Sequence, residues 1–543
     1  MTTTEIKRRD GMARTGIFTV GTWSVRTPAV LDTAALFPAL MSMSGTNVPL
    51  AADTDFVRMY HVQHRDQPVI IHPHLDNPAS SGDCVLVANW HPALENPRDY
   101  VTWLCALKEK TPPDTTWYAP AAALPSNLHI LCYSGFDLFD FCAVDLKSAQ
   151  GIFCIPEGEF AQKTMGSEIC TCDGCKKGEL HQHNRLALLR EISLVTQFIE
   201  LGQIREFVES RCRLHANHVA ILRHLDNRHE VMERHAPIAR SGVMRVNSGE
   251  SIHRAEIRRF AARVVSRYHP SDTDVAVLLP CSAKKPYSLS VSHRKFRMAI
   301  ANRAHELVVT SPLGIVPREL ETVYPAGHYD VPVTGYWDAE ECTMIAGAVA
   351  RYIEKNPYRR IIVHLEGGAL KVVRMAAEIC GITPEFSCCE QPASPTALSA
   401  LDNALAGERH IKDDRLHGIC SYQFGIEMDP RGFSVRGRFP ALFYSRERLQ
   451  YFSIDTMTGM LRPTFDGWDL LPSGYRVFID DFVPEGDVLV PGVTDADQEI
   501  REGDEVLVIG VRACATGRAS MSGVEMLRSK RGVAVRVRKV KRV

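Results

Sequence analysis

The hydrophobic and polar positions of the first 235 residues alternate between short apolar runs and helical periodicity. Apolar runs occupy 85–88 and 128–132, and an amphipathic helical pattern covers 184–213. Apolar runs of four to eight residues favour buried strands, and spacing of three and four favours helices. The pattern therefore predicts an α/β unit in this part of the chain.

A second α/β unit is predicted over 236–400. Residues 254–268 repeat apolar side chains at helical spacing, and 274–280 and 359–364 are apolar runs typical of buried strands. Helices are expected at 294–306 and 369–380. Strand–loop–helix repeats predict a parallel sheet whose functional site lies at the strand ends.

The last part of the chain divides into a mixed segment and a small β-rich unit. Residues 400–465 carry little pattern, and from Tyr475 onward short β-like runs alternate with glycine-containing turns. That alternation favours a small barrel. We therefore expect an α/β multidomain protein with units at 1–235, 236–400, 401–470 and 471–543.

Composition narrows the class of protein without naming a partner. The 543 residues are 45% hydrophobic and 23% charged, with net charge −1, so disordered and collagen-like chains are excluded. There is no apolar run of about 18 residues and no signal peptide at the start, so a cytoplasmic protein is expected. The 16 cysteines are then expected as thiols or metal ligands.

Three cysteines and a histidine lie within 14 residues. Cys170, Cys172 and Cys175 are followed by His183, and three thiolates with one imidazole suit tetrahedral Zn²⁺. Four protein ligands leave no open position, so a structural zinc ion is predicted. His181 is the competing fourth ligand.

The segment 280–293 concentrates chemically active side chains directly after a predicted strand. It holds Cys281, two lysines, a tyrosine, four serines and His293. Nearby positive charge and a histidine favour the nucleophilic thiolate. The alternative is a polar connector that contains a buried cysteine. A second polar segment, rich in proline and glycine, extends over 311–338 and is expected to line a pocket. Its candidate side chains are Arg318, Glu319, His328, Tyr329, Asp330 and Trp337.

The last 16 residues are strongly basic. Eight of the residues 528–543 are Lys or Arg, none is acidic, and valines nearly alternate with the charges. This pattern predicts a strand with one basic face that binds phosphate backbones. The alternative is a terminal edge strand whose charges prevent aggregation. The predicted RNA-binding residues are Arg528, Lys530, Arg531, Arg536, Arg538 and Lys539.

Two resemblances organise these motifs. Segments 477–481, 490–497, 501–508, 516–520 and 531–535 resemble a PUA domain, a small RNA-binding pseudo-barrel. The first 235 residues resemble tRNA-guanine transglycosylases, which implies a modified (β/α)8 barrel, with Asp140 at the nucleophile position and His183 as the fourth zinc ligand. The second catalytic aspartate motif of that family has no counterpart near 40–54. Base exchange needs both carboxylates, so the barrel is interpreted as a retired catalyst.

The middle of the chain resembles archaeosine synthases, paralogues of the archaeal transglycosylases. Their pattern P-C-x3-K-P-Y-x2-S-x2-H is met in full by Pro280, Cys281, Lys285, Pro286, Tyr287, Ser290 and His293. The resemblance implies that an amine is added to the nitrile of 7-cyano-7-deazaguanine at position 15 of the tRNA D-arm. It makes Cys281, Lys285, Tyr287, Ser290 and His293 the catalytic candidates. Substrate-binding candidates are Ser282, Arg318, Glu319, His328 and Asp330.

The resemblance also implies partners. In one branch of that family the amine is lysine and a radical-SAM enzyme cleaves the adduct, whereas other branches use glutamine or ammonia. Related transglycosylases pair as dimers, and no membrane partner is expected. Two other functions stay open. One is guanine exchange by a transglycosylase, and the other is non-catalytic tRNA binding.

Overall fold

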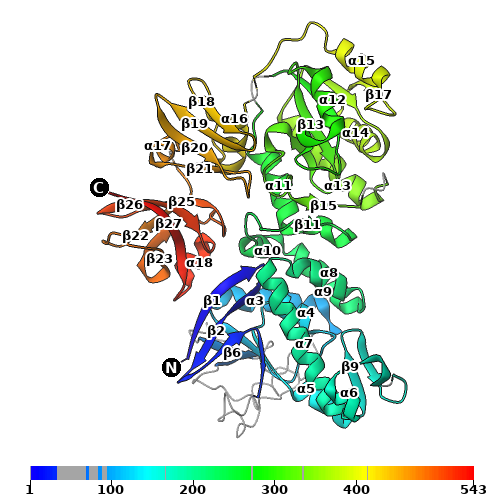
Figure 1. Cartoon of the computed structure of the whole chain (residues 1–543), viewed down its shortest axis with the longest axis vertical. Coiled ribbons are helices and arrows are strands. Elements are labelled where there is room, and N and C mark those ends of the chain that lie inside the picture. The colour runs from blue at the N-terminus through cyan, green and yellow to red at the C-terminus, as the bar shows by residue number, and fades with distance from the viewer. Residues whose placement is uncertain are drawn as a thin grey trace.

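The structure is a computed structural model, and it describes residues 2–32, 69–71, 83–87, 95–165, 167–270, 273–332, 336–412, 414–471 and 473–543. The N-terminal half lies at one end of the long axis and the middle α/β unit at the other (Figure 1). The two C-terminal units lie beside them. The 40–54 region, where a second catalytic aspartate was sought, lies outside the described residues.

The N-terminal half contains two sheets. The first is an antiparallel sheet in the order β1–β2–β3. The second is parallel in the order β4–β8–β7–β6–β5, so β5 to β8 are neighbours in chain order and β8 pairs with β4, the first strand. Among the described residues β4 and β5 are the two edges of this sheet, and the closed (β/α)8 barrel stays a prediction. The bounds are β1 Thr2–Asp10, β2 Ala13–Val20, β3 Trp23–Thr27, β4 Ala29–Leu31, β5 Val69–Ile71, β6 Cys84–Val87, β7 Thr116–Ala119 and β8 Leu138–Asp140.

Helices cover the parallel sheet of this half. The helical pattern predicted over 184–213 forms two helices, because Gly202 adopts φ +68° and ends the first of them. A two-stranded hairpin and a short helix precede the first of these two helices. The bounds are α3 Pro97–Lys110, α4 Leu128–Tyr133, α5 Cys142–Ala149, β9 Ile152–Ile155, β10 Gly158–Ala161, α6 Asp173–Lys177, α7 Leu180–Leu201, α8 Ile204–Cys212, α9 Ala216–Asn227 and α10 His229–His235.

The middle unit contains the predicted parallel sheet. Its order is β14–β13–β12–β16–β17, with β14 antiparallel to the other four strands. The chain runs from β12 outward on one side and then returns to place β16 on the other side. The helix predicted at 254–268 is confirmed as α11, and α12 is shorter than predicted because the chain turns at Ala301. The bounds are α11 Ala255–Ser266, β12 Val275–Pro280, α12 Val291–Ile300, β13 His305–Thr310, β14 Gly314–Pro317, α13 Ala339–Lys355, β16 Arg360–His364, α14 Gly367–Cys380, β17 Glu385–Cys388 and α15 Pro395–Ala404.

The two C-terminal units are a four-stranded and a six-stranded sheet. The first has the order β18–β19–β20–β21 and follows α16 (Arg415–Phe424). The second has the order β23–β27–β26–β25–β22–β24, in which the basic C-terminal segment is β27. The bounds are β18 Ser434–Arg438, β19 Ala441–Arg446, β20 Leu449–Ile454, β21 Leu461–Pro463, β22 Arg476–Ile479, β23 Val488–Leu489, β24 Val493–Ala496, β25 Glu505–Ile509, β26 Ala513–Ala519, α18 Gly523–Arg528 and β27 Val533–Arg542.

The hydrophobic core divides near one of the proposed domain boundaries. One buried cluster runs from Met12 to Met232, and another begins at Ile238 and continues through the middle and C-terminal units to Val535. This division supports a boundary at 235, which remains a proposal like the boundaries at 400 and 470. In the part of the chain that the structure describes, every helix is too short or too polar to cross a bilayer.

Candidate active site and nucleic-acid interface

Cys281 lies where ligands bind in open α/β sheets. It directly follows β12, the strand from which the order of the sheet reverses. Crevices at the carboxyl ends of the strands form at such a reversal. A pocket of about 540 Å³ opens at this point, and half-buried Cys281 lines it.

The pocket brings together residues from several segments of the middle unit. Ser311 follows β13, Trp337 precedes α13, and Glu366 and Gly367 follow β16. Trp337 was expected to line a pocket from its place in the polar segment. Glu366 was missed as a site residue, although it follows a predicted strand just as Cys281 does.

Lys285 is half-buried and interacts electrostatically with Cys281. Its Nζ lies 3.9 Å from the centre of the Tyr329 ring, a cation–π contact. Burial lowers the pKa of Lys285 below its ordinary value, while the charges of Cys281 and Asp330 act in the opposite direction. A lysine of this kind releases its proton more readily than an exposed one.

Tyr287 supports Lys285 indirectly, through the side chain of Tyr329. Its hydroxyl lies 2.8 Å from that of Tyr329, which in turn lies 2.6 Å from the hydroxyl of Thr310. Tyr287 is completely buried, and burial holds the pKa of its hydroxyl well above the ordinary value. Tyr287 therefore positions the Tyr329 ring that contacts Lys285, and it does not line the pocket.

The side chain of His293 is buried beneath the loop that joins β12 to α12 and does not line the pocket. Its Nε2 donates to the carbonyl of Pro280 at 2.9 Å, and its Nδ1 accepts from Arg318 at 2.8 Å. The ring is 1% exposed, and burial followed by the Arg318 charge lowers the pKa of His293 to about 3. A neutral histidine with both nitrogens engaged has no proton to offer a ligand. The expectation that His293 acts on the nitrile does not match this geometry.

Ser290 is part of the same support. Its hydroxyl accepts from the backbone N–H of His293 at 3.2 Å and caps the N-terminus of α12. The cap fixes the start of the helix that carries His293. Ser290 is buried, so its contact is with the helix and not with the pocket.

The predicted substrate-binding residues lie mostly away from the pocket. Arg318 is half-buried between Glu306 and Glu321, with Nε 2.9 Å from Glu306 and Nη1 3.0 Å from Glu321. Glu319 is buried against Tyr268 and His305, at 3.0 and 3.1 Å. These two charges support the core of the middle unit.

The other three predicted substrate-binding residues lie around the loop. His328 is half-buried, and burial lowers the pKa of its imidazole. Asp330 is exposed and acts electrostatically on Lys285. Ser282 is half-buried, and its hydroxyl donates to the carbonyl of Lys284 at 2.9 Å.

The four predicted metal ligands converge. One ligand atom from each of Cys170, Cys172, Cys175 and His183 lies within 4.8 Å of all the others. His183 Nδ1 lies 3.2 Å from Cys175 Sγ, and Nε2 donates to the carbonyl of Cys154 at 3.1 Å. That outer hydrogen bond leaves Nδ1 available as a ligand. The arrangement fits a tetrahedral metal ion.

His181, the competing ligand, points elsewhere. It is exposed, and its Nε2 lies 3.0 Å from the carboxylate of Asp145. His183 begins the buried face of α7 and stacks on Phe153, with ring centres 3.8 Å apart. The cluster therefore uses His183.

Asp140 ends β8 and is enclosed. Its carboxylate accepts hydrogen bonds from the Tyr118 hydroxyl at 2.7 Å and from the backbone N–H groups of Ala121 and Cys142 at 3.0 Å. Only 2% of the residue is exposed. A carboxylate held in this way is poorly placed for attack on a sugar.

The basic C-terminal segment has two kinds of cation. Arg528 donates to the carbonyls of Glu109 and Thr111, and Lys530 and Arg531 pair with Asp83, so all three hold the segment against the N-terminal half. Arg538 pairs with Glu505 at 2.5 Å. Arg536 and Lys539 are exposed.

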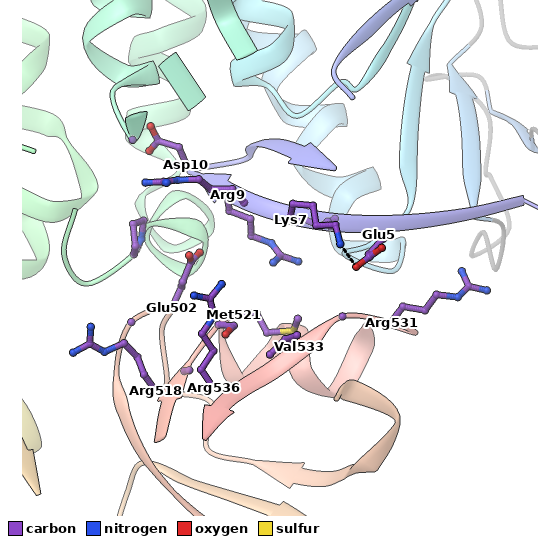
Figure 2. Close-up of a pocket in the computed structure, with 18 of the residues that line it drawn as sticks. Glu5, Lys7, Arg9, Asp10, Glu502, Arg518, Met521, Arg531, Val533 and Arg536 are labelled. Atoms are coloured by element: carbon purple, nitrogen blue, oxygen red, sulfur yellow. Dashed lines mark hydrogen bonds and ion pairs between the residues drawn. The ribbon is translucent and has the colours of Figure 1, made fainter. Parts of the chain in front are cut away.

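A cationic cleft of about 840 Å³ lies between β1 and the last sheet. Figure 2 shows Lys7 and Arg9 on the β1 side and Arg518, Arg531 and Arg536 on the opposite side. Glu502 also lines it, and burial raises the pKa of this carboxyl to about 7. The sequence analysis did not predict the cations of β1 as RNA-binding residues. The basic run 7–9 is the sequence feature that could have indicated them.

Comparisons with known proteins show what this chain is similar to. Residues 257–405 match the family described as domain of unknown function (DUF5591), and 475–541 match the PUA domain. An archaeosine synthase of Haloferax volcanii is 34% identical, with 99% of each chain covered. The archaeosine synthase subunit alpha of Methanosarcina acetivorans is 38% identical over 82% of this chain and 78% of its own length.

A more distant relative has a different printed activity. A tRNA-guanine(15) transglycosylase of Methanobrevibacter smithii is 24% identical over 75% of this chain and 63% of its own length. Identity over most of the chain is thus higher to the archaeosine synthases than to this transglycosylase. With its PUA domain, the chain is an enzyme that acts on tRNA in archaeosine biosynthesis, and it belongs to the archaeosine synthase family.

Proposed function

We propose that the protein adds an amine to the nitrile of 7-cyano-7-deazaguanine at position 15 in the D-arm of tRNA. The observation that carries this proposal is the position of Cys281 in a pocket at the reversal point of the sheet, where the thiol interacts electrostatically with Lys285. A thiol next to a partly buried cation is suited to attack an electrophilic carbon.

The proposed reaction involves no oxidation or reduction. The Cys281 sulfur bonds to the nitrile carbon, and the nitrile nitrogen takes a proton, which gives a thioimide. The amine nitrogen then bonds to the same carbon, the carbon–sulfur bond breaks, and the thiol is restored. The product is an amidine, and every atom of the nitrile is kept.

Lys285 supplies the proton in this proposal. Its ammonium interacts with Cys281, and its pKa is lowered by burial, so it can favour the thiolate and then protonate the nitrogen. Gly367 and Gly368 begin α14 on the pocket wall, and the Glu366 side chain does not cap that helix. Its first backbone N–H groups are therefore available to the nitrogen as charge develops.

The motif residues behind the loop are assigned a positioning role. Tyr287 holds the ring under Lys285, and His293 fixes the carbonyl of Pro280, one residue before Cys281. Ser290 caps the helix that carries His293. These contacts set the place of the thiol and the ammonium without touching the base.

A structural zinc ion and RNA contacts complete the proposal. Cys170, Cys172, Cys175 and His183 would hold Zn²⁺ and fix the loop that precedes α7. Enclosure of Asp140 supports a barrel that serves as a platform for tRNA and no longer exchanges bases. Arg536 and Lys539 are proposed to contact phosphates.

The experiment offers tRNA that carries 7-cyano-7-deazaguanine together with lysine, glutamine or ammonia, and reads the nucleoside mass afterwards. A mass gain equal to one amine supports the proposal and identifies the donor. A lysine adduct would pass to a radical-SAM partner for cleavage to the formamidine. Release of labelled guanine that depends on Asp140 would instead assign base exchange. Light scattering tests the proposed homodimer.

A further inference from the structure

The pocket contains two groups that the nitrile chemistry does not use. Glu366 and Trp337 line the same cavity as Cys281. Neither belongs to the motif over 280–293. A carboxylate and an indole in one pocket offer hydrogen-bond acceptors and an aromatic face to a ligand.

The other two carboxylates of the pocket are occupied by the protein. Glu341 accepts from the Ser311 hydroxyl and from the backbone N–H of Asp338, and Asp338 accepts from the backbone N–H of Glu341 at 2.8 Å. Together they cap α13. Glu366 does not cap its own helix; its Oε2 accepts from the backbone N–H of Gln391 at 2.9 Å, and the side chain is exposed to the cavity.

The register of the sheet sets the distance between Cys281 and Glu366. Leu278 of β12 pairs with Val363 of β16, and the cysteine and the glutamate each stand three residues farther along their strands. Parallel neighbours are about 4.8 Å apart, so the two residues leave the sheet side by side. A flat ligand that spans the two strand ends can meet the thiol at one side and the carboxylate at the other.

A guanine-type base carries an electrophilic group at one edge and hydrogen-bond donors at the opposite edge. In 7-cyano-7-deazaguanine the nitrile is on the five-membered ring, and the N1–H and exocyclic amino donors are on the far edge of the six-membered ring. Enzymes that modify a base take it out of the stack, bind its Watson–Crick edge by hydrogen bonds and stack it on aromatic side chains. One carboxylate accepts from both neighbouring donors.

We propose that Glu366 is the residue that recognises the guanine edge of the flipped base, and that Trp337 stacks on its face. This assignment rests on the proposed function and adds its base specificity. It selects the 2-amino base against cyano-bases that lack the amino group. It also places the nitrile toward Cys281.

The test compares two RNA substrates within each variant. Synthetic tRNA carries either 7-cyano-7-deazaguanine or its 2-deamino analogue at the target position. Wild-type protein should favour the first by about 10- to 100-fold in kcat/KM, the discrimination expected of a bidentate contact. In Glu366→Gln and Glu366→Ala the ratio should approach one. Glu378→Gln, on the exposed face of the same helix, should keep the wild-type ratio.

Equilibrium binding of the same two RNAs is measured beside turnover, so that a slow variant still yields a ratio. An unchanged ratio in Glu366→Gln overturns the proposal. An unchanged ratio with a raised KM for the amine also overturns it and assigns Glu366 to the donor. Failure of the wild type to modify either RNA contradicts the proposed function, whereas the binding ratio still tests Glu366.

Discussion

The ammonium of Lys285 lies 3.9 Å from the centre of the Tyr329 ring and interacts electrostatically with Cys281. The ring is held by the hydroxyls of Tyr287 and Thr310. The motif tyrosine therefore acts on the cation through a second tyrosine that lies 42 residues farther along the chain. This support keeps a partly buried lysine next to the thiol.

Replacement of Lys285 tests its role as the proton source. Lys285→Met should lower kcat by about 10²- to 10⁴-fold, the range of general acid catalysis. An acid must be protonated to act, so wild-type activity should fall as pH rises through the pKa of Lys285, which burial places below 10.5. That alkaline decrease should disappear in Lys285→Met.

His293 provides the contrasting variant. It is buried and neutral with a pKa of about 3, so His293→Gln should lower stability and leave the alkaline limb of the pH–rate profile in place. Thermal unfolding and pH–rate profiles are recorded for both variants. Loss of the limb in His293→Gln and its persistence in Lys285→Met would reverse the two assignments.

The periodicity of the sequence predicts β12, β16 and the helices around them, because each strand is a nearly uninterrupted apolar run. It also places Cys281 at a strand end. It does not show which motif side chains face the pocket. His293 is turned inward by its place three residues after the Ser290 cap, and Arg318 by its two glutamates. His293 is also held by Pro280 and Arg318, which lie 13 and 25 residues away in the chain, and the sequence pattern does not show these contacts.

Removal of the proposed zinc ion should destabilise the N-terminal half. Purified protein should hold one equivalent of zinc, and Cys175→Ser should hold little and melt several degrees lower, because the loop before α7 loses its cross-link. Metal analysis and thermal unfolding measure both effects. Cys389→Ser, an exposed cysteine outside the cluster, is the control. Metal-free wild-type protein with the same melting temperature would contradict this assignment.

Point substitutions test RNA binding better than truncation, since β27 lies inside the six-stranded sheet and its removal would disrupt that unit. The double variant Arg536→Ala with Lys539→Ala should lower tRNA affinity and reduce the salt slope by about one per phosphate contact. Lys176→Ala, whose ammonium pairs with Asp173, serves as the control. Equal affinity and slope in the double variant would exclude both residues from the interface.

Glu502 makes stability depend on pH. Burial raises its pKa from 4.5 to about 7, so the folded state holds this proton more tightly than the unfolded state. Its contribution is fully present below pH 4.5 and is lost as pH rises through 7. Glu502→Gln should therefore unfold at higher denaturant than wild type at pH 8, and the gain should shrink at pH 4.5. A gain that is independent of pH would contradict the raised pKa.

The most direct measurement is single-turnover conversion of cyano-modified tRNA by Cys281→Ser. Conversion by Cys281→Ser should be at least about 10³-fold slower than by wild type, because the thioimide route is lost, and tRNA affinity should be unchanged. Without amine, the wild-type protein should stop at the thioimide. Denaturing mass spectrometry should then show the protein with the added mass of one cyano-modified tRNA. Near wild-type conversion by Cys281→Ser would contradict the account and make the thiol a part of the pocket wall.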